Sequence, residues 1–125
     1  VAGEFAYGLT DTDDFNLARL AGADVEAIFP DQEKGQRGAL LIPNSVSLIK
    51  GAKHKAAAKK LIDFLLSPRV EALLAKGRSA QIPVRAGIVR PDWIPTDLRW
   101  MSLEWSSVGK AFKPSQKFLQ TEFIK

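Results

Sequence analysis

The 125-residue sequence contains no cysteine, which excludes disulfides and thiolate metal sites without identifying the compartment. It contains one histidine, His54, and with neither cysteine nor a second histidine most nucleophilic and zinc chemistries are excluded. No apolar run approaches the ~20 residues that a membrane-spanning helix needs. Neither a Walker pattern nor a Gly-x-Gly-x-x-Gly fingerprint occurs, so no glycine-rich phosphate loop is expected.

The composition, with 46% hydrophobic and 26% charged residues, indicates a globular chain. Its net charge is +4, and the densest basic cluster precedes and enters an amphipathic helix, at Lys50, Lys53, Lys55, Lys59 and Lys60. Aromatic residues are not interleaved with these lysines, so no stacking platform for nucleic acid is expected. A solvated helix face is the preferred interpretation, and a basic binding module is a remote alternative.

Residues 3–14 are the most informative part of the chain. An apolar run, Phe5–Leu9, is predicted to form a strand and stops at Thr10, and a helical pattern follows. Three carboxylates lie at this junction, at Asp11, Asp13 and Asp14. In open α/β sheets, ligands bind where the carboxyl end of a strand meets a helix N-terminus. The candidate ligand-binding residues are therefore Thr10, Asp11, Thr12 and Asp13, followed by Tyr7 and Asp14.

Helix capping is the competing interpretation of the same residues. Thr10 is a good N-cap, and Asp13 three residues later completes a capping arrangement. Acidic side chains in a first turn also favour the helix dipole. Capping accounts for Thr10 and one or two aspartates but gives Thr12 no role, so both interpretations stay open.

The remaining pattern predicts an α/β fold. Strands or extended segments are expected at about 4–9, 25–29, 39–42, 45–49 and 80–84. Helices are expected at about 11–21, 54–66, 67–77, 98–112 and 115–125. Asn44 lies beside Pro43 between two of the extended segments, an interruption at which a chain can pass between two lobes, and it is a weaker candidate site residue.

The Asp11-Thr12-Asp13 triplet after a strand resembles the first motif of haloacid-dehalogenase-type phosphotransferases. That resemblance implies a magnesium-dependent phosphatase with Asp11 as nucleophile and Asp13 as its partner. Such enzymes also need a later acidic pair at a strand end, and the remaining acidic residues here are scattered. The phosphatase is therefore the alternative hypothesis.

The order of segments resembles the C-terminal part of extracytoplasmic solute-binding proteins of ABC importers, in particular the iron(III)-type class. The resemblance covers nearly the whole chain and is strongest over residues 3–84. The resemblance rests on the segments 3–14, Phe29-Pro30-Asp31-Gln32, 38–44, 47–52 and the helix-forming stretch 56–68, which ends in Ser67-Pro68.

This resemblance implies a fragment of a two-lobed type II periplasmic-binding-protein fold. Residues 1–36 would form part of lobe 2, residues 37–49 the crossover strand between lobes, and residues 50–125 the C-terminal part of lobe 1. The implied protein is not an enzyme. It captures a small ligand, with ferric ion as one candidate, by hinge closure and delivers it to a membrane permease. The implied location is periplasmic or extracytoplasmic, with the signal peptide outside this sequence.

The residues of this loop do not by themselves identify the ligand. Iron-binding relatives carry adjacent tyrosines in the loop where this chain has Thr10 to Asp13, and Tyr7 is its only tyrosine. The Asp11 and Asp13 carboxylates could hold a metal ion. The hydroxyls of Thr10 and Thr12, with helix N-terminal N–H groups, could instead bind an anion or a polar solute. As a fragment, the chain is also expected to self-associate to cover apolar surface.

Overall fold

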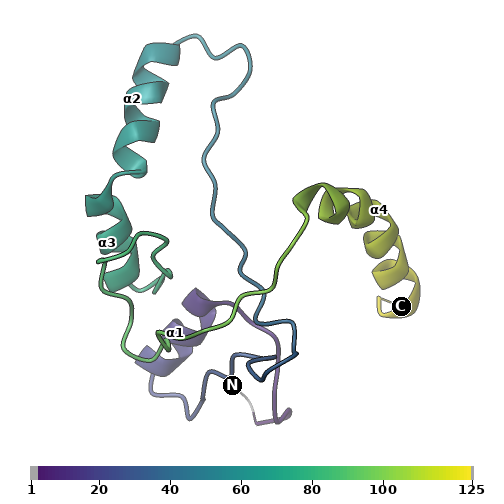
Figure 1. Cartoon of the computed structure of the whole chain (residues 1–125). Helices are drawn as coiled ribbons and strands as arrows, with labels where there is room; N and C mark the ends of the chain where they lie inside the picture. Colours follow the sequence, from purple (N-terminus) through teal and green to yellow (C-terminus); the bar gives the residue numbers. More distant parts are fainter. Residues whose placement is uncertain (1–2, 125) are drawn as a thin grey trace. The chain divides into compact units, whose positions relative to one another are not determined.

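The computed structural model describes residues 3–124 and contains four helices there (Figure 1). They are α1 (Thr12–Leu20), α2 (Lys55–Leu65), α3 (Pro68–Lys76) and α4 (Trp105–Glu122). The chain divides into two units, each described by itself below. Unit one comprises residues 3–28 and Ile42–Asp97, and unit two comprises Phe29–Leu41 and residues 98–124. No helix of the described chain is long and apolar enough to cross a membrane.

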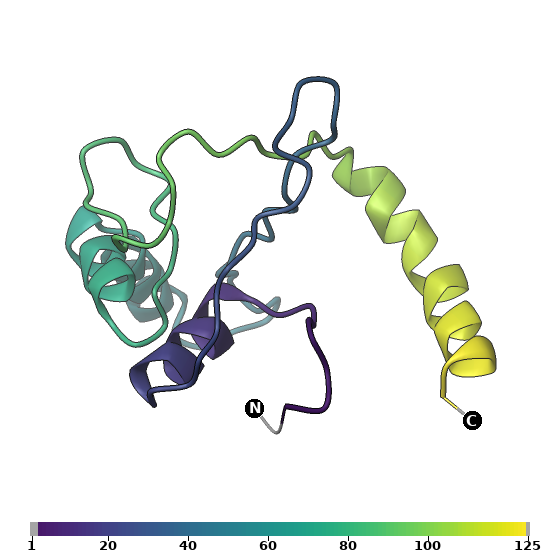
Figure 2. The same ribbon diagram turned by 90° about the horizontal axis from the view of Figure 1, so that it is seen from below.

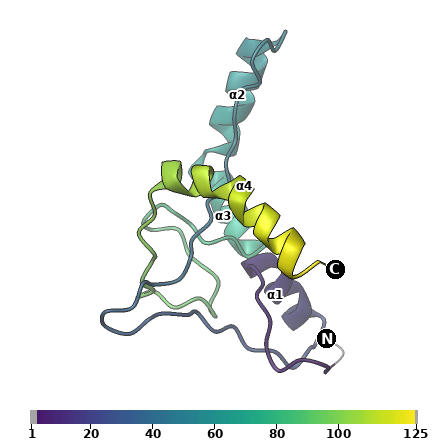
Figure 3. The same cartoon turned by 90° about the vertical axis from the view of Figure 1, so that its right-hand side faces the viewer.

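The first three predicted helices are confirmed to within one or two residues at each end. The break between α2 and α3 forms as the sequence requires, because Ser67 caps α3 and Pro68 occupies its first position. The Ser67 hydroxyl accepts a hydrogen bond from the backbone N–H of Val70 at 3.4 Å. Successive helices α2 and α3 contact each other and run one after the other in Figure 3.

The two helices predicted at about 98–112 and 115–125 are wrong. Residues 98–104 are not helical, and α4 is a single helix that continues through Pro114. Proline removes one backbone N–H and bends a helix, yet the turns on either side hold the helix together here. The ribbon of α4 curves in the view of Figure 1, whereas it looks nearly straight in the view of Figure 2. The predicted end, Lys125, lies outside the described residues.

The predicted strands do not form in the described part of the chain, so the α/β class is not confirmed. Residues 3–124 contain one isolated parallel bridge, between Ala39 and Trp100. A strand is completed by hydrogen bonds to a neighbouring strand, and within residues 3–124 the isolated bridge is the only strand-type pairing. Residues 23–29 still show alternating exposure, with half-buried Ala23, Val25, Ala27 and Phe29 between exposed Asp24, Glu26 and Ile28. The exposure period of a strand is therefore present in this segment, although it is not a strand.

Packing in unit one joins α1 to the segment that follows α3. The Phe15 and Trp93 rings lie 4.6 Å apart between centroids in a tilted arrangement. The buried side chain of Asn16 donates from Nδ2 to the carbonyl of Arg78 at 3.0 Å. The buried apolar residues of unit one are few among those described, namely Ala75, Ala80 and Ile94, and Ala39 is buried in unit two.

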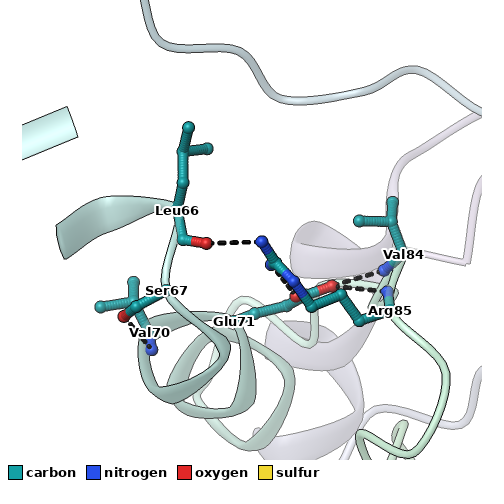
Figure 4. A network of polar contacts seen from close by, with 6 residues as sticks. All are labelled: Leu66, Ser67, Val70, Glu71, Val84 and Arg85. Atoms are coloured by element: carbon teal, nitrogen blue, oxygen red, sulfur yellow. Dashed lines mark hydrogen bonds and ion pairs between the residues drawn. The ribbon is translucent and has the colours of Figure 1, made fainter. Parts of the chain in front are cut away.

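A polar cluster fixes residues 84–85 against α3 (Figure 4). Glu71 accepts the backbone N–H groups of Val84 at 2.6 Å and Arg85 at 2.9 Å through Oε1. The Arg85 guanidinium pairs with Oε2 of Glu71 and also donates to the carbonyl of Leu66 at the end of α2. One arginine thus ties α3 to the C-terminus of α2.

In unit two, the loop around residues 31–38 closes on Arg99. The Arg99 guanidinium donates to the carbonyls of Glu33 and Gln36, and the Arg99 backbone exchanges hydrogen bonds with the Gln32 side chain. Gly38 has φ +89°, and a Cβ there would lie 2.8 Å from the Arg99 carbonyl oxygen. Only glycine allows this close backbone approach beside the Ala39–Trp100 bridge.

Candidate functional site

The N-cap of α1 is Asp11 and not Thr10. The helix begins at Thr12, so Asp11 occupies the N-cap in an extended conformation. Its Oδ1 accepts the backbone N–H of Asp14 at 3.2 Å. The predicted Thr10 cap with Asp13 is therefore wrong. The capping pair lies one residue later, which leaves Thr10, Thr12 and Asp13 outside the cap.

The carboxyl groups of Asp11 and Asp13 interact with each other. A hydrogen bond from the Asp13 side chain is the main cause that lowers the pKa of Asp11, and the bond to the Asp14 N–H adds to it. The same contact with Asp11 is the main cause that raises the pKa of Asp13. Neighbouring carboxyls shift each other's pKa in this way, because ionisation of the first makes ionisation of the second less favourable. The pair can hold a proton or attract a positively charged group.

The structure brings together some of the predicted site residues. Asp11, Thr12, Asp13 and Asp14 form one group at the start of α1, with Thr12 and Asp13 half-buried. Tyr7 precedes this group in the chain and is 93% exposed. Asn44 instead donates its side-chain amide to Oε1 of Gln81.

A metal centre is not formed at this loop. In residues 3–124, no group of three or more His, Cys, Asp or Glu side chains is placed to hold a metal ion. Asp11 and Asp13 provide two adjacent carboxyls, one of which is engaged in capping. A bare divalent or trivalent cation usually needs more oxygen ligands than this pair supplies.

A second feature of unit one was not predicted from the sequence. A cavity of about 300 Å³ lies between the second half of α1, the end of α3 and residues 89–93. Its lining includes four cationic side chains, Arg19, Lys76, Arg78 and Arg90, against one carboxylate, Asp92, which lies 3.7 Å from Arg19. Arg19 and Lys76 also stand in the last turns of their helices, where cations complement the dipole. No local motif could reveal the cavity, because it is assembled from segments far apart in the chain.

Comparison with known proteins decides the family. Residues 1–99 match the profile described as bacterial extracellular solute-binding protein. The chain belongs to this family. Its members are binding proteins and not enzymes, and they act outside the cytoplasm, so the predictions of a non-enzyme and of an extracytoplasmic location are confirmed at this level.

Three curated relatives from Salmonella typhimurium LT2, Salmonella paratyphi A and Salmonella typhi share 36% identity over 78 residues. Each of the three is named as a periplasmic protein inferred to bind 2-aminoethylphosphonate. The aligned region covers 62% of this chain and 23% of each relative, so the chain spans about a quarter of their length. No solved structure matches the chain.

The family assignment supports the coarse form of the sequence prediction and not its finer details. The comparisons identify a solute-binding protein, but they do not identify the iron(III)-type class. They give no support to the phosphatase alternative.

Proposed function

We propose that these residues belong to the solute-binding component of an ABC importer, which captures a small ligand and delivers it to a membrane permease. The observation that carries the proposal is the family match over residues 1–99. In this proposal, residues 1–36 and 50–125 belong to different lobes, residues 37–49 cross between them, and ligand closes the hinge.

The proposed ligand is a small aminoalkylphosphonate and not ferric ion. The names of the three Salmonella relatives support this ligand class. The single, exposed Tyr7 and the lack of a three-residue ligand group in residues 3–124 argue against ferric ion.

The loop before α1 suits a ligand that carries both charges. Such a ligand has an ammonium group, which the carboxyl pair of Asp11 and Asp13 would attract. Its phosphonate oxygens would accept hydrogen bonds from the hydroxyls of Thr10 and Thr12 and from first-turn N–H groups. A simple inorganic anion would be repelled by the same carboxylates, so the ammonium group is the part of the ligand that fits them.

The test is a calorimetric titration with 2-aminoethylphosphonate. Since the proposal makes these residues part of a larger two-lobed protein, the complete polypeptide that contains them is titrated. Saturable binding of 2-aminoethylphosphonate, with weaker binding of both ethylphosphonate and ethanolamine, is expected. Tight binding of ferric citrate without binding of the phosphonate would overturn the ligand assignment.

A pair of variants locates the site within the chain. Asp13→Asn is expected to weaken binding by about tenfold, because it removes a charge-assisted contact to the ammonium group. Asp24→Asn removes an exposed carboxylate outside the loop and is expected to leave the affinity unchanged. Equal affinities of the two variants would place the ligand elsewhere in the protein.

A further inference from the structure

The cavity in unit one is surrounded by far more cationic than acidic side chains. Arg19, Lys76, Arg78 and Arg90 line its volume of about 300 Å³, together with a single carboxylate, that of Asp92. All of these residues belong to unit one. The cavity therefore carries an excess of positive charge that its own carboxylate does not neutralise.

The helix dipoles account for only part of this excess. Arg19 and Lys76 stand in the last turns of α1 and α3, where each helix end carries roughly half a negative charge. Arg78 and Arg90 lie outside both helices, so no dipole explains them. The two helix ends and Asp92 together offset about half of the four positive charges, and a charge of about +2 remains.

The Asp92 carboxylate is a weak internal competitor for these cations. Its Oδ1 lies 3.7 Å from a guanidinium nitrogen of Arg19, and the two side chains are exposed, 43% for Arg19 and 87% for Asp92. An exposed ion pair of this length contributes little free energy, because water screens both charges. An anion with better-placed oxygens can therefore replace Asp92 as the partner of Arg19.

The other three cations of the cavity are available to a ligand. Lys76, Arg78 and Arg90 form no ion pair within residues 3–124. Arg90 is half-buried and donates from Nη1 to the carbonyl of Pro95 at 2.8 Å, which positions its guanidinium and leaves further N–H groups to donate. Guanidinium groups bind phosphate and carboxylate oxygens in pairs, so three arginines around one cavity favour an oxyanion.

The remaining wall of the cavity is largely apolar and includes Leu20, Ala75, Val89, Pro91 and Trp93. Its volume of about 300 Å³ is at the lower end of the range for small organic ligands, and about ten times the ~30 Å³ that one water molecule takes up in the liquid. A bare phosphate ion would leave much of this space unfilled. A phosphate attached to a compact apolar group would contact both the cations and the apolar wall.

A small anion suits this cavity better than another segment of polypeptide does. Arg19, Lys76 and Arg78 are exposed in unit one. Covering them with protein would cost free energy unless each cation gained a carboxylate partner. A dianion supplies two negative charges in a single group, which matches the charge that remains in the cavity.

We propose that this cavity is a binding site for a compact phosphomonoester dianion that carries no ammonium group. The four cations would repel an ammonium group, which distinguishes this ligand from the one proposed for the loop before α1. The site shares no residue with that loop, so the proposal does not rest on the proposed function.

The first experiment is a calorimetric titration of phenyl phosphate into the complete polypeptide that contains these residues. It is done at low salt and about pH 8, where a second pKa of roughly 6 makes the phosphate a dianion. Saturable binding of phenyl phosphate is expected. Inorganic phosphate, which lacks the ring, should bind more weakly, and phenol, which lacks the charge, should not bind at the same concentrations.

Three variants locate the binding. Arg78→Gln removes an exposed cation of the cavity and is expected to weaken binding by about tenfold. Asp92→Asn removes the competing carboxylate and is expected to tighten binding by about threefold. Arg69→Gln is the matched control, because it removes an exposed arginine of α3 that does not line the cavity, and it should leave the affinity unchanged. Circular dichroism of each variant separates loss of folding from loss of binding.

Three outcomes would overturn the proposal. The absence of phenyl phosphate binding by the complete polypeptide would show that the cavity is not a site for this ligand. Equal weakening by Arg78→Gln and Arg69→Gln, or no tightening by Asp92→Asn, would place the dianion elsewhere in the protein. Tighter binding of phthalate, a dicarboxylate with the same ring, would overturn the assignment of a phosphate group.

Discussion

Glu71 and Arg85 form the polar joint that holds the segment after α3. The carboxylate of Glu71 accepts both the Arg85 backbone N–H and its guanidinium, which in turn reaches the carbonyl of Leu66. The hydrogen bonds from Arg85 are the main reason that the pKa of Glu71 is lowered, and the bond from the Val84 N–H adds to the effect. Two helices and the following segment therefore depend on one carboxylate being ionised.

The pH dependence of unfolding follows from this joint. Because the pKa of Glu71 is lower in the folded state than in the unfolded state, its contribution is complete above the usual glutamate pKa. That contribution is lost as the pH falls toward the lowered value. Urea unfolding of the chain is expected to show a smaller midpoint in acid, and Glu71→Gln is expected to reduce that dependence. An unchanged acid dependence in Glu71→Gln would show that other carboxylates cause it.

The carboxyl pair before α1 is expected to titrate in two separated steps. Carboxyl-carbon NMR should place the step assigned mainly to Asp13 at higher pH than the step assigned mainly to Asp11. Asp11→Asn is expected to lower the pKa of Asp13, because it removes the neighbouring charge. The reciprocal variant, Asp13→Ala, removes the side-chain donor to Asp11 and should raise the pKa of Asp11. Two overlapping titrations that neither variant shifts would contradict the contact.

Gly38 is expected to tolerate no side chain. Gly38→Ala combines a positive φ with a backbone clash at Arg99, and it should lower the free energy of unfolding by more than about 1 kcal/mol. Gly35→Ala is the matched control, because Gly35 has φ +88° with open space around its Cβ position. Chemical denaturation of both variants separates the clash from the cost of positive φ alone. Equal losses would mean that Arg99 moves aside.

The Ser67 cap is expected to contribute measurably to α3. Ser67→Ala removes the acceptor for the Val70 N–H and should cost about 1 kcal/mol in thermal or denaturant unfolding. Ser67→Asp keeps an acceptor at the same position and should retain most of the stability. A loss as large for Ser67→Asp as for Ser67→Ala would show that the hydroxyl does not act as a cap.

The helices could be predicted from the sequence because their signals are local. The Ser67-Pro68 pair, the amphipathic pattern of α2 and the polar start of α1 each depend on residues within a single helix or its cap. The predicted strands are not observed, because a strand depends on a partner that lies elsewhere in the chain and not on local signals alone. Alternation in residues 23–29 sets which side chains face inward, but a strand also needs a neighbour, and sequence pattern says nothing about whether one is present. The break predicted between the helices at about 98–112 and 115–125 does not form, because the turns on both sides of Pro114 continue the helix.

The part of the candidate site that is local in the sequence could be predicted, and the part built from distant segments could not. The acidic group at the start of α1 is local, so its members could be recognised, although the cap lies at Asp11 and not at Thr10. The cavity lined by Arg19 and Arg78 depends on contacts between α1 and a segment some 60 residues later, such as that of Asn16 with Arg78. No spacing rule connects positions so far apart.

The hydrogen bonds between Arg99 and the loop at residues 32–36 can form only late in synthesis of the chain. The loop that begins near Gln32 receives its hydrogen bonds from a residue 67 positions later in the chain. While the ribosome is still making the intervening helices, the carbonyls of Glu33 and Gln36 have no guanidinium to bind. This loop must therefore remain hydrated until Arg99 emerges from the exit tunnel, so α1, α2 and α3 have the opportunity to form before it closes.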